Sequence, residues 1–218
     1  MDSPGDVGFE LDGWSLFWAR LARVDGGHAA LANLRVVVVE QARERFQIET
    51  LASEPAVAGL RALFRAAGSD PTRYRPSSEA LIRRVLKGNE LPAISPLVDI
   101  NNCLSLSLGV PCCVMDEQTI SPPFVMRAGS EGESYESLRG PFNLESRPLL
   151  ADSVGVCDAP ITGSQRVKVT PKTQVAWLVA YLPQGVVSAE EAGRTLEQLL
   201  RSAPVANATN VLSYPETE

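Results

Sequence analysis

One run of side chains constrains the fold of this chain more than any other, because every residue from Val175 to Leu182 is apolar. A membrane-crossing helix needs about 20 apolar residues, so this run is too short to span a bilayer. A strand with apolar side chains on both faces is stable only when both faces are covered. We therefore expect a central strand inside a layered domain that combines sheets and helices, a mixed α/β fold.

The composition is that of a globular protein with its own core. The chain has 218 residues, of which 44% are hydrophobic, and a domain of this size buries about 70% of the surface of its unfolded chain. Its N-terminus lacks the basic and apolar segments of a secretory signal, so we expect a cytoplasmic protein with no membrane partner. The formal net charge of −6 argues against a broad DNA- or RNA-binding surface. A pocket that meets only one end of a nucleic acid stays compatible with that charge.

The residues that most often bind metals are few and badly spaced. The four cysteines are Cys103, Cys112, Cys113 and Cys157, without a CxxC pair, so zinc-ligand spacing is absent. We expect them to be reduced and mostly buried. His28 is the sole histidine and lies in a Gly-Gly-His stretch, which predicts a solvated loop. A two-histidine metal site within one chain is excluded, a Ser-His-Asp triad has almost no support, and we expect no metal and no cofactor.

The two ends of the chain are expected to lie outside the main domain. Residues 1–30 predict an appendage with a short amphipathic helix ended by the glycines at 26 and 27. The apolar residues of that helix would be Trp14, Leu16, Phe17, Trp18 and Leu21. They would pack on the domain or on a second copy of the chain, so a homodimer is one expected assembly. The domain itself is expected over residues 31–203, followed by a loose tail over 204–218.

Within the domain, the spacing of apolar residues and of capping residues predicts alternating elements. The β-branched run 34–39 is expected to be a buried strand. Helices are expected from 55, 77, 95 and 189, each bounded by Ser, Pro or Gly signals, with Ser77 as one N-cap and Ser188 and Glu191 as a capping box. Further strands are expected over 112–115, 148–151, 166–170 and 175–182, with hairpins and loops between 117 and 147.

Polar residues interrupt the apolar face of the helix that begins at Ser95-Pro96. Asn101 is four residues from Leu97 and three from Leu104, so it shares their face. An amide on an apolar face is costly unless it finds a partner. Asn101 and its neighbour Asn102 are therefore candidate ligand contacts, although Asn102 could equally hold the following loop by hydrogen bonds.

The order of polar residues in this region resembles a known family. Two stretches, Arg75 to Gly88 and Ile94 to Asn102, look like B3/4 domain proteins and the editing (B3/B4) domain of the phenylalanyl-tRNA synthetase beta subunit. The family's Asp-Ile-Thr-Asn-Tyr corresponds to 99–103 here, and its Gly-x-Pro-x-His-x-Phe-Asp to 109–116. A weaker match covers 149–152 and 159–173. The resemblance spans roughly residues 33–183, and it implies a three-layer β-β-α sandwich with a ligand cleft where the matched segments meet.

The resemblance also implies a set of substrate-binding residues, without assigning any catalytic one. They are Arg75, Glu79, Asn101, Asn102, Cys113, Thr162, Gly163 and Ser164. Three of these positions depart from the family: Cys113 stands where the family has histidine, Ser164 where it has the glutamate that recognises tyrosine, and Asn101 where it has threonine. The tyrosine preference of the synthetase is therefore expected to be lost while the cleft is kept.

Two functions follow as expectations from this resemblance. One is a free-standing trans-editing domain that hydrolyses mischarged aminoacyl-tRNA and meets the tRNA 3′ end transiently. An aminoacyl ester is already activated, so placing a water and directing polar groups at the oxyanion, at about 3 kcal/mol per donor, would suffice. The alternative is a non-catalytic module that binds a free amino acid or a similar small ligand.

For several candidate residues, a structural role is an alternative to ligand contact or catalysis. Cys113 could be a core residue, and Arg75 could pair with Glu79 rather than guide a phosphate. Asp116 and Asp152 are expected to fix a turn and a loop rather than to act as catalysts. No cation lies near Cys113 in the sequence to lower its thiol pKa, so a cysteine nucleophile is not expected.

Overall fold

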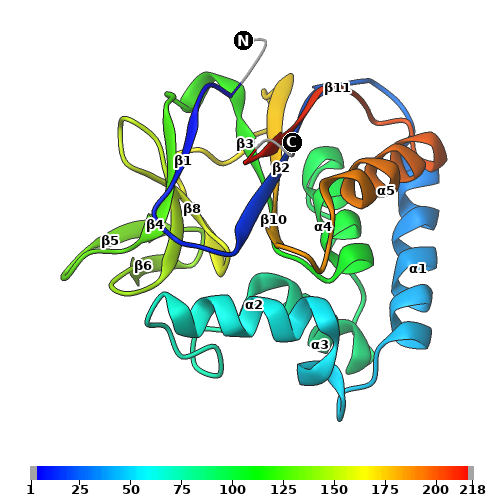
Figure 1. The fold of residues 1–218 in the computed structure, drawn as a ribbon. Helices are drawn as coiled ribbons and strands as arrows, with labels where there is room; N and C mark the ends of the chain where they lie inside the picture. The colour runs from blue at the N-terminus through cyan, green and yellow to red at the C-terminus, as the bar shows by residue number, and fades with distance from the viewer. Residues whose placement is uncertain (1–3, 216–218) are drawn as a thin grey trace.

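The computed structural model describes residues 4–215 and arranges them in three layers, a sheet, a second sheet and a layer of helices (Figure 1). The first sheet contains, in spatial order, β1 (Val7–Phe9), β4 (Phe124–Ala128), β7 (Pro148–Ala151), β8 (Val156–Ala159) and β9 (Thr162–Gly163). The second contains β11 (Ala206–Tyr214), β2 (Trp14–Arg23), β10 (Val175–Pro183) and β3 (Cys112–Asp116). The expected mixed α/β fold in a β-β-α arrangement is confirmed.

Helices cover the far face of the second sheet and one end of both sheets. Helices α1 (His28–Arg45), α4 (Pro96–Leu108) and α5 (Ala189–Ser202) form the third layer. Helices α2 (Pro55–Ala66) and α3 (Ser77–Leu86) lie below the layers in Figure 1. The smaller elements are the hairpin β5 (Ser134–Ser137) and β6 (Gly140–Asn143), and the 3-10 turns η1 (Leu51–Ser53) and η2 (Glu117–Thr119).

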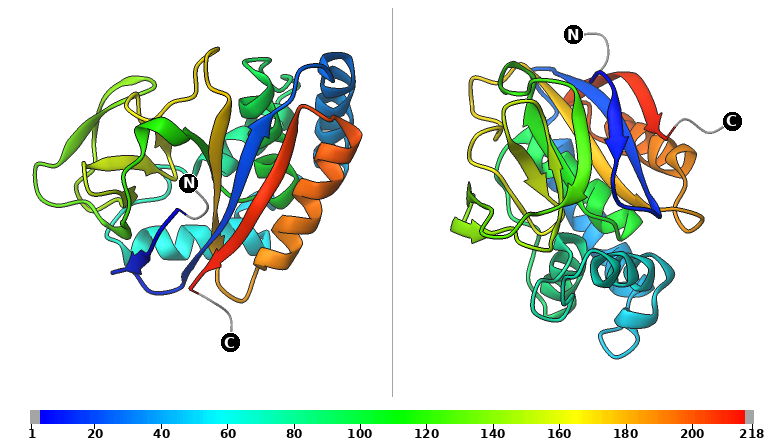
Figure 2. Two further views of the ribbon diagram at one scale, coloured as in Figure 1. Left: turned by 90° about the horizontal axis from the view of Figure 1, so that it is seen from above. Right: turned by 60° about the vertical axis from the view of Figure 1, so that its left-hand side comes forward.

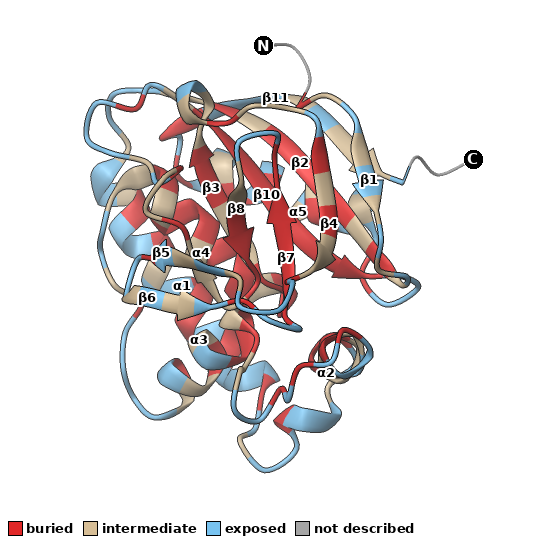
Figure 3. Ribbon diagram, turned by 90° about the vertical axis from the view of Figure 1, so that its left-hand side faces the viewer, coloured by how far each residue is buried: buried red, intermediate tan, exposed pale blue. Residues whose placement is uncertain are grey.

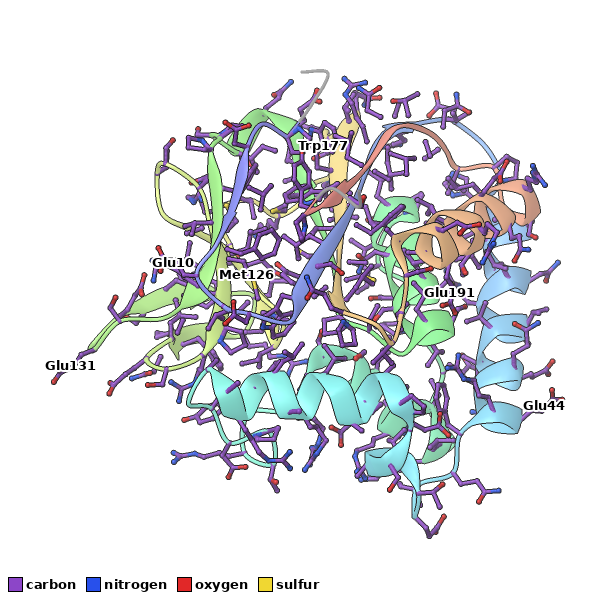
Figure 4. All side chains as sticks on the ribbon, in the orientation of Figure 1. Glu10, Glu44, Met126, Glu131, Trp177 and Glu191 are labelled. Carbon is purple, nitrogen blue, oxygen red and sulfur yellow. The ribbon has the colours of Figure 1, made fainter. Side chains whose placement is uncertain are left out.

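Strand β10 is the central strand that its apolar run predicts. It pairs antiparallel with β2 on one side and with β3 on the other, and its residues from Ala176 to Pro183 are all buried, as Figure 3 shows. Figure 4 places Met126 among the side chains between the two sheets, whereas Glu44 and Glu131 point away from the molecule. The core thus fills both spaces between layers, which is why the strand is apolar on both faces.

The N-terminal aromatic segment is a strand, and the expected helix over Trp14–Leu21 is wrong. Strand β2 lies between β10 and β11 in the second sheet (Figure 2). Its side chains alternate between the two spaces: the Trp18 ring lies 5.0 Å from the Phe124 ring of the first sheet, whereas Phe17 lies against Gly193 of α5. A strand buried on both faces carries apolar residues at most positions, and that pattern also satisfies helical spacing.

Three further local predictions fail, each because tertiary contacts override a local signal. The run 34–39 belongs to α1, where Val38 is buried and Val36 is 56% exposed, so the β-branched run forms a helix with one face on the core. Residues 166–170 form only a single bridge between Lys168 and Met115. The expected loose tail contains the nine-residue strand β11, of which seven residues pair with β2.

Most helix boundaries agree with their sequence signals. Helix α4 ends at Gly109, which has a left-handed φ of 73°, and the Ser188 hydroxyl accepts a hydrogen bond from the Glu191 N–H at the start of α5. Ser77 is not an N-cap, because α3 begins at Ser77 itself and Pro76 precedes it without a side-chain cap.

Candidate functional site

A cleft of about 530 Å³ lies where α3, α4, β3 and the β8–β9 turn meet. Its lining includes Asn101 and Asn102 of α4, Cys113 of β3, and the residues Thr162, Gly163 and Ser164. Segments more than 40 residues apart in the chain thus line one cleft. Six of the eight predicted site residues are brought together here.

The two asparagines of α4 differ in their hydrogen bonds and in their exposure. The Asn101 amide Nδ2 donates to the Cys112 carbonyl at 3.2 Å and so fixes the start of β3. Its Oδ1 is buried and accepts no hydrogen bond from residues 4–215. The half-buried Asn102 side chain makes no hydrogen bond within that range, so its amide is available to a ligand and does not hold the 109–116 loop.

The β8–β9 turn presents small polar groups to the opposite wall. Gly163 pairs with Asp158 across the two strands, and a Cβ at Gly163 would lie 3.0 Å from Leu138 Cδ1, so glycine keeps the cleft open beside Leu138. The Thr162 carbonyl accepts a hydrogen bond from the Tyr135 hydroxyl. The Ser164 hydroxyl accepts one from the Arg166 N–H at 3.1 Å, which stabilises the end of the turn.

One cleft residue that the sequence reasoning missed is Asp158. It is 3% exposed, it lies in β8, and its Oδ2 accepts a hydrogen bond from the Tyr181 hydroxyl of β10 at 2.7 Å. Burial raises the pKa of Asp158 to about 7, and hydrogen bonds from Tyr181, Cys113 and the Ala159 backbone limit the rise. The signal was a lone carboxylate inside an otherwise apolar strand, Val-Cys-Asp-Ala.

The cysteines around the cleft are poor nucleophiles. Burial and the neighbouring Asp158 raise the pKa of Cys113 well above its ordinary value, and the same two causes raise the pKa of Cys112. Burial raises the pKa of Cys103 to about 12. Because the thiolate is the reactive form, these thiols act as apolar wall and core.

The outer wall of the cleft carries cations, although the chain as a whole is acidic. Arg84, Arg139 and Lys168 all line it and are all exposed. Asp158 is the only carboxylate among the lining residues, and it is buried. The rim is therefore locally positive on a protein with a net charge of −6, and such a patch attracts anionic groups.

Two predicted site residues, Arg75 and Glu79, do not line this cleft. The Glu79 carboxylate is fully buried between α2 and α3, where it pairs with Arg61 at 3.0 Å, Arg83 at 2.9 Å and Arg75 at 3.3 Å. The alternative of an Arg75–Glu79 ion pair is thus the one that the structure contains. A buried carboxylate needs such partners to offset the cost of its desolvation. This cluster therefore stabilises the packing of α3 against α2.

The other two carboxylates in the matched segments hold loops. Asp116 accepts hydrogen bonds from the Gln118 N–H and the Thr173 hydroxyl. Asp152 accepts from the backbone N–H of Ser121 and pairs with Arg166 at 2.9 Å. Both therefore shape the segments beside the cleft without lining it, as expected for turn- and loop-fixing carboxylates.

Residues 4–215 contain neither a cluster of potential metal ligands nor a membrane-spanning helix. Within that range no three His, Cys, Asp or Glu side chains gather in a way that could hold a metal ion. The described part of the chain also contains no helix that is both long and apolar enough to cross a membrane.

These features define a class of protein: a three-layer α/β domain with a cleft between an asparagine-bearing helix and a glycine turn of the first sheet. The sequence profile of the B3/4 domain family matches residues 59–198, which include α3, α4 and both walls of the cleft. The chain belongs to the B3/4 domain family.

Two individual proteins are similar to the chain. The phenylalanine–tRNA ligase beta subunit of Bartonella henselae is 37% identical over 87 residues, which are 38% of this chain and 11% of that protein. An N-terminal fragment of the phenylalanyl-tRNA synthetase beta subunit from Pyrococcus horikoshii superposes with a TM-score of 0.49 at 14% identity. That superposition covers 97% of this chain and 54% of the fragment, and at this score it adds no argument to the family assignment. The chain therefore spans only a part of both relatives.

Proposed function

We propose that this protein hydrolyses mischarged aminoacyl-tRNA, with the aminoacyl ester bound in the cleft. One observation carries the proposal: in a member of the B3/4 family, related to a phenylalanine–tRNA ligase beta subunit, the cleft gathers Asn102 of α4 and the Thr162–Ser164 turn. Both groups are polar, and both border an otherwise mostly apolar space. Hydrogen bonds within the protein leave part of their donor and acceptor capacity unused.

The cleft suits a reaction that needs positioning more than a strong base. Hydrolysis of an ester develops negative charge on the carbonyl oxygen, and each well-aimed donor stabilises that charge by about 3 kcal/mol. The Asn102 amide and the Thr162 hydroxyl supply such donors. The terminal ribose hydroxyl of the tRNA supplies a proton-transfer group beside the ester, so the cleft needs neither histidine nor thiolate.

The rim cations supply the means of meeting a tRNA despite the acidic surface. Arg84, Arg139 and Lys168 surround the outer wall, where phosphates of the single-stranded 3′ end would pass. About three phosphate contacts would give weak binding with a shallow salt dependence, with a slope of roughly −2 in log K against log salt concentration for a single strand. Such transient binding suits an enzyme that samples many tRNAs.

Specificity is proposed to differ from tyrosine removal. Ser164 lies 4% exposed at the cleft wall and already accepts a hydrogen bond from Arg166 N–H, so it is a short neutral group and not a carboxylate acceptor for a phenol. A site built to pair with a substrate hydroxyl discriminates by about 10⁴-fold, and without that acceptor the preference should vanish. Cys113, which also lines the cleft, makes it less polar than a histidine would.

The test is a deacylation assay with a panel of mischarged tRNAs, including tyrosyl-tRNA that carries the phenylalanine anticodon. We expect one other substrate to be cleared and tyrosine to be removed slowly or not at all. Fast tyrosine-selective hydrolysis that is lost in Ser164→Ala would overturn the proposed change of specificity.

A second candidate function is a binding module for a free amino acid. The observation that favours it is the composition of the cleft wall, which contains no histidine and only thiols with raised pKa values among the residues that line it. A thermal-shift screen of amino acids decides between the two: stabilisation by a free amino acid without hydrolysis of any tRNA would favour the binding module.

A further inference from the structure

The cleft contains two buried side chains with acceptor oxygens, Asn101 and Asp158, and one of these oxygens has no donor. Asn101 is 6% exposed, and its Oδ1 is buried without a partner among residues 4–215. Its amide orientation is fixed chemically, because Nδ2 must face the Cys112 carbonyl, which can only accept. An unpaired buried oxygen costs free energy, so this side chain is suited to a donor that residues 4–215 do not supply.

The second acceptor is the Asp158 carboxylate. Tyr181 donates to its Oδ2 at 2.7 Å, while Oδ1 lies on the side of Gly163, where a Cβ would be only 3.7 Å away. The carboxylate is close enough to Cys112 and Cys113 to raise the pKa of both thiols, and Cys112 is the residue to which Asn101 is bonded. Asn101 and Asp158 both line the cleft beside Cys112, and we call this part of the cleft its corner.

A ligand group complementary to this corner must bring donors and positive charge. A primary ammonium carries three N–H donors and no acceptor. A metal ion is disfavoured, because no three His, Cys, Asp or Glu side chains gather anywhere in residues 4–215. Guanidinium is planar and broad, whereas the corner lies between a glycine turn and a helix.

We propose that Asp158 and Asn101 Oδ1 form an ammonium subsite that binds the α-amino group of the aminoacyl substrate. The inference rests on the proposed function and deepens it, because the subsite selects a free α-amine over an acylated or hydroxyl counterpart. The α-ammonium is two bonds from the ester carbonyl, and Asp158 pairs with Gly163 across the β8–β9 turn. Anchoring the amine thus positions the carbonyl beside Thr162 and Ser164. An ammonium contact also keeps ionised a carboxylate whose pKa burial raises to about 7.

The test compares two isosteric, hydrolysis-resistant probes by titration calorimetry at pH 7.5. One is 3′-deoxy-3′-(L-alanylamino)adenosine, whose methyl side chain makes little demand on specificity. The other carries an L-lactyl group, in which a hydroxyl replaces the ammonium. We expect the protein to prefer the amine by at least about 30-fold, because removing one member of a buried charge pair weakens binding by that factor or more.

Two variants test whether Asp158 causes the preference for the amine probe. Asp158→Asn should reduce it to within about threefold. Glu131→Gln removes an exposed carboxylate from the turn before β5, with the same change of charge, and should leave the preference unchanged. Equal binding of the two probes, binding of neither, or a preference that survives in Asp158→Asn would overturn the inference. The wild-type comparison decides even if a variant fails to fold. If the protein prefers the amine but hydrolyses no tRNA, the proposed function is wrong and the ammonium subsite stands. If it hydrolyses tRNA esters without that preference, the ammonium subsite is wrong and the proposed function stands.

Discussion

Replacing Asp158 with asparagine should make the protein more stable at pH 8. The carboxylate is buried with one strong hydrogen bond from Tyr181, and its pKa is raised to about 7 from an ordinary 3.8. The folded state therefore binds a proton more tightly than the unfolded state. The contribution of protonated Asp158 to the free energy of unfolding is fully present below about pH 4, and it is lost as the pH rises to about 7 and above.

The size of the effect follows from that difference. About three pH units at about 1.4 kcal/mol each amount to about 4 kcal/mol between acid and pH 8. Asparagine keeps the shape and the acceptor oxygen for Tyr181 but carries no charge. We therefore expect Asp158→Asn to raise the free energy of unfolding by about 2 to 4 kcal/mol at pH 8, where wild-type Asp158 is charged, and by less than about 1 kcal/mol at pH 4.

Urea unfolding of both proteins at the two pH values measures this directly, with the slope in denaturant as a check that both unfold in the same way. A variant that is less stable than the wild type at pH 8 would refute the reasoning, because Asp158 would then be contributing stability as an ion. A gain at pH 8 would mean that a charged group is kept in the cleft at the expense of stability, as is common at functional sites.

Two further predictions concern buried groups outside the proposed chemistry. Glu79→Ala should lower the free energy of unfolding, measured by urea denaturation, by about 3 kcal/mol or more. The reason is that the substitution leaves the arginines around Glu79 without their carboxylate partner. Glu197→Ala, which breaks an exposed pair with Arg201, should cost less than about 0.5 kcal/mol; similar losses in both would contradict the structural role of Glu79. Cys113 in the folded protein should react with iodoacetamide at pH 8 at least about tenfold more slowly than in the urea-unfolded chain, since its raised pKa leaves little thiolate, and mass spectrometry showing comparable rates would contradict this.

The layered fold and one face of the cleft were predictable because their signals are local. The apolar run of β10 indicates a strand covered on both sides, and the helix with Asn101 and Asn102 is bounded by Ser95-Pro96 and Gly109. The meeting of α4 with the 162–164 turn was predicted only through the family resemblance, since no local pattern relates segments some 60 residues apart.

The errors have several physical origins, and one of them is that burial on two faces removes periodicity. Strand β2 is apolar at most positions because the first sheet and α5 cover its two faces, and the same residues satisfy a helical pattern. Strand β11 carries little apolar signal because all but one of its residues are exposed or half-buried. Asp158 was overlooked because its importance depends on Tyr181, which only the packing of the two sheets brings within 2.7 Å.

The measurement that tests the central claim most directly is the single-turnover hydrolysis of the substrate that the tRNA panel identifies, by wild-type protein and by Asn102→Ala. Asn102 makes no hydrogen bond within residues 4–215 and lines the cleft, so its loss should leave the unfolding midpoint nearly unchanged. Arg201→Ala, on the exposed side of α5, serves as the matched control. We predict at least about a 100-fold slower reaction for Asn102→Ala, as for other lost oxyanion donors, and an unchanged rate for Arg201→Ala. An Asn102→Ala protein that folds normally and hydrolyses the ester at the wild-type rate would contradict the assignment of the reaction to this cleft.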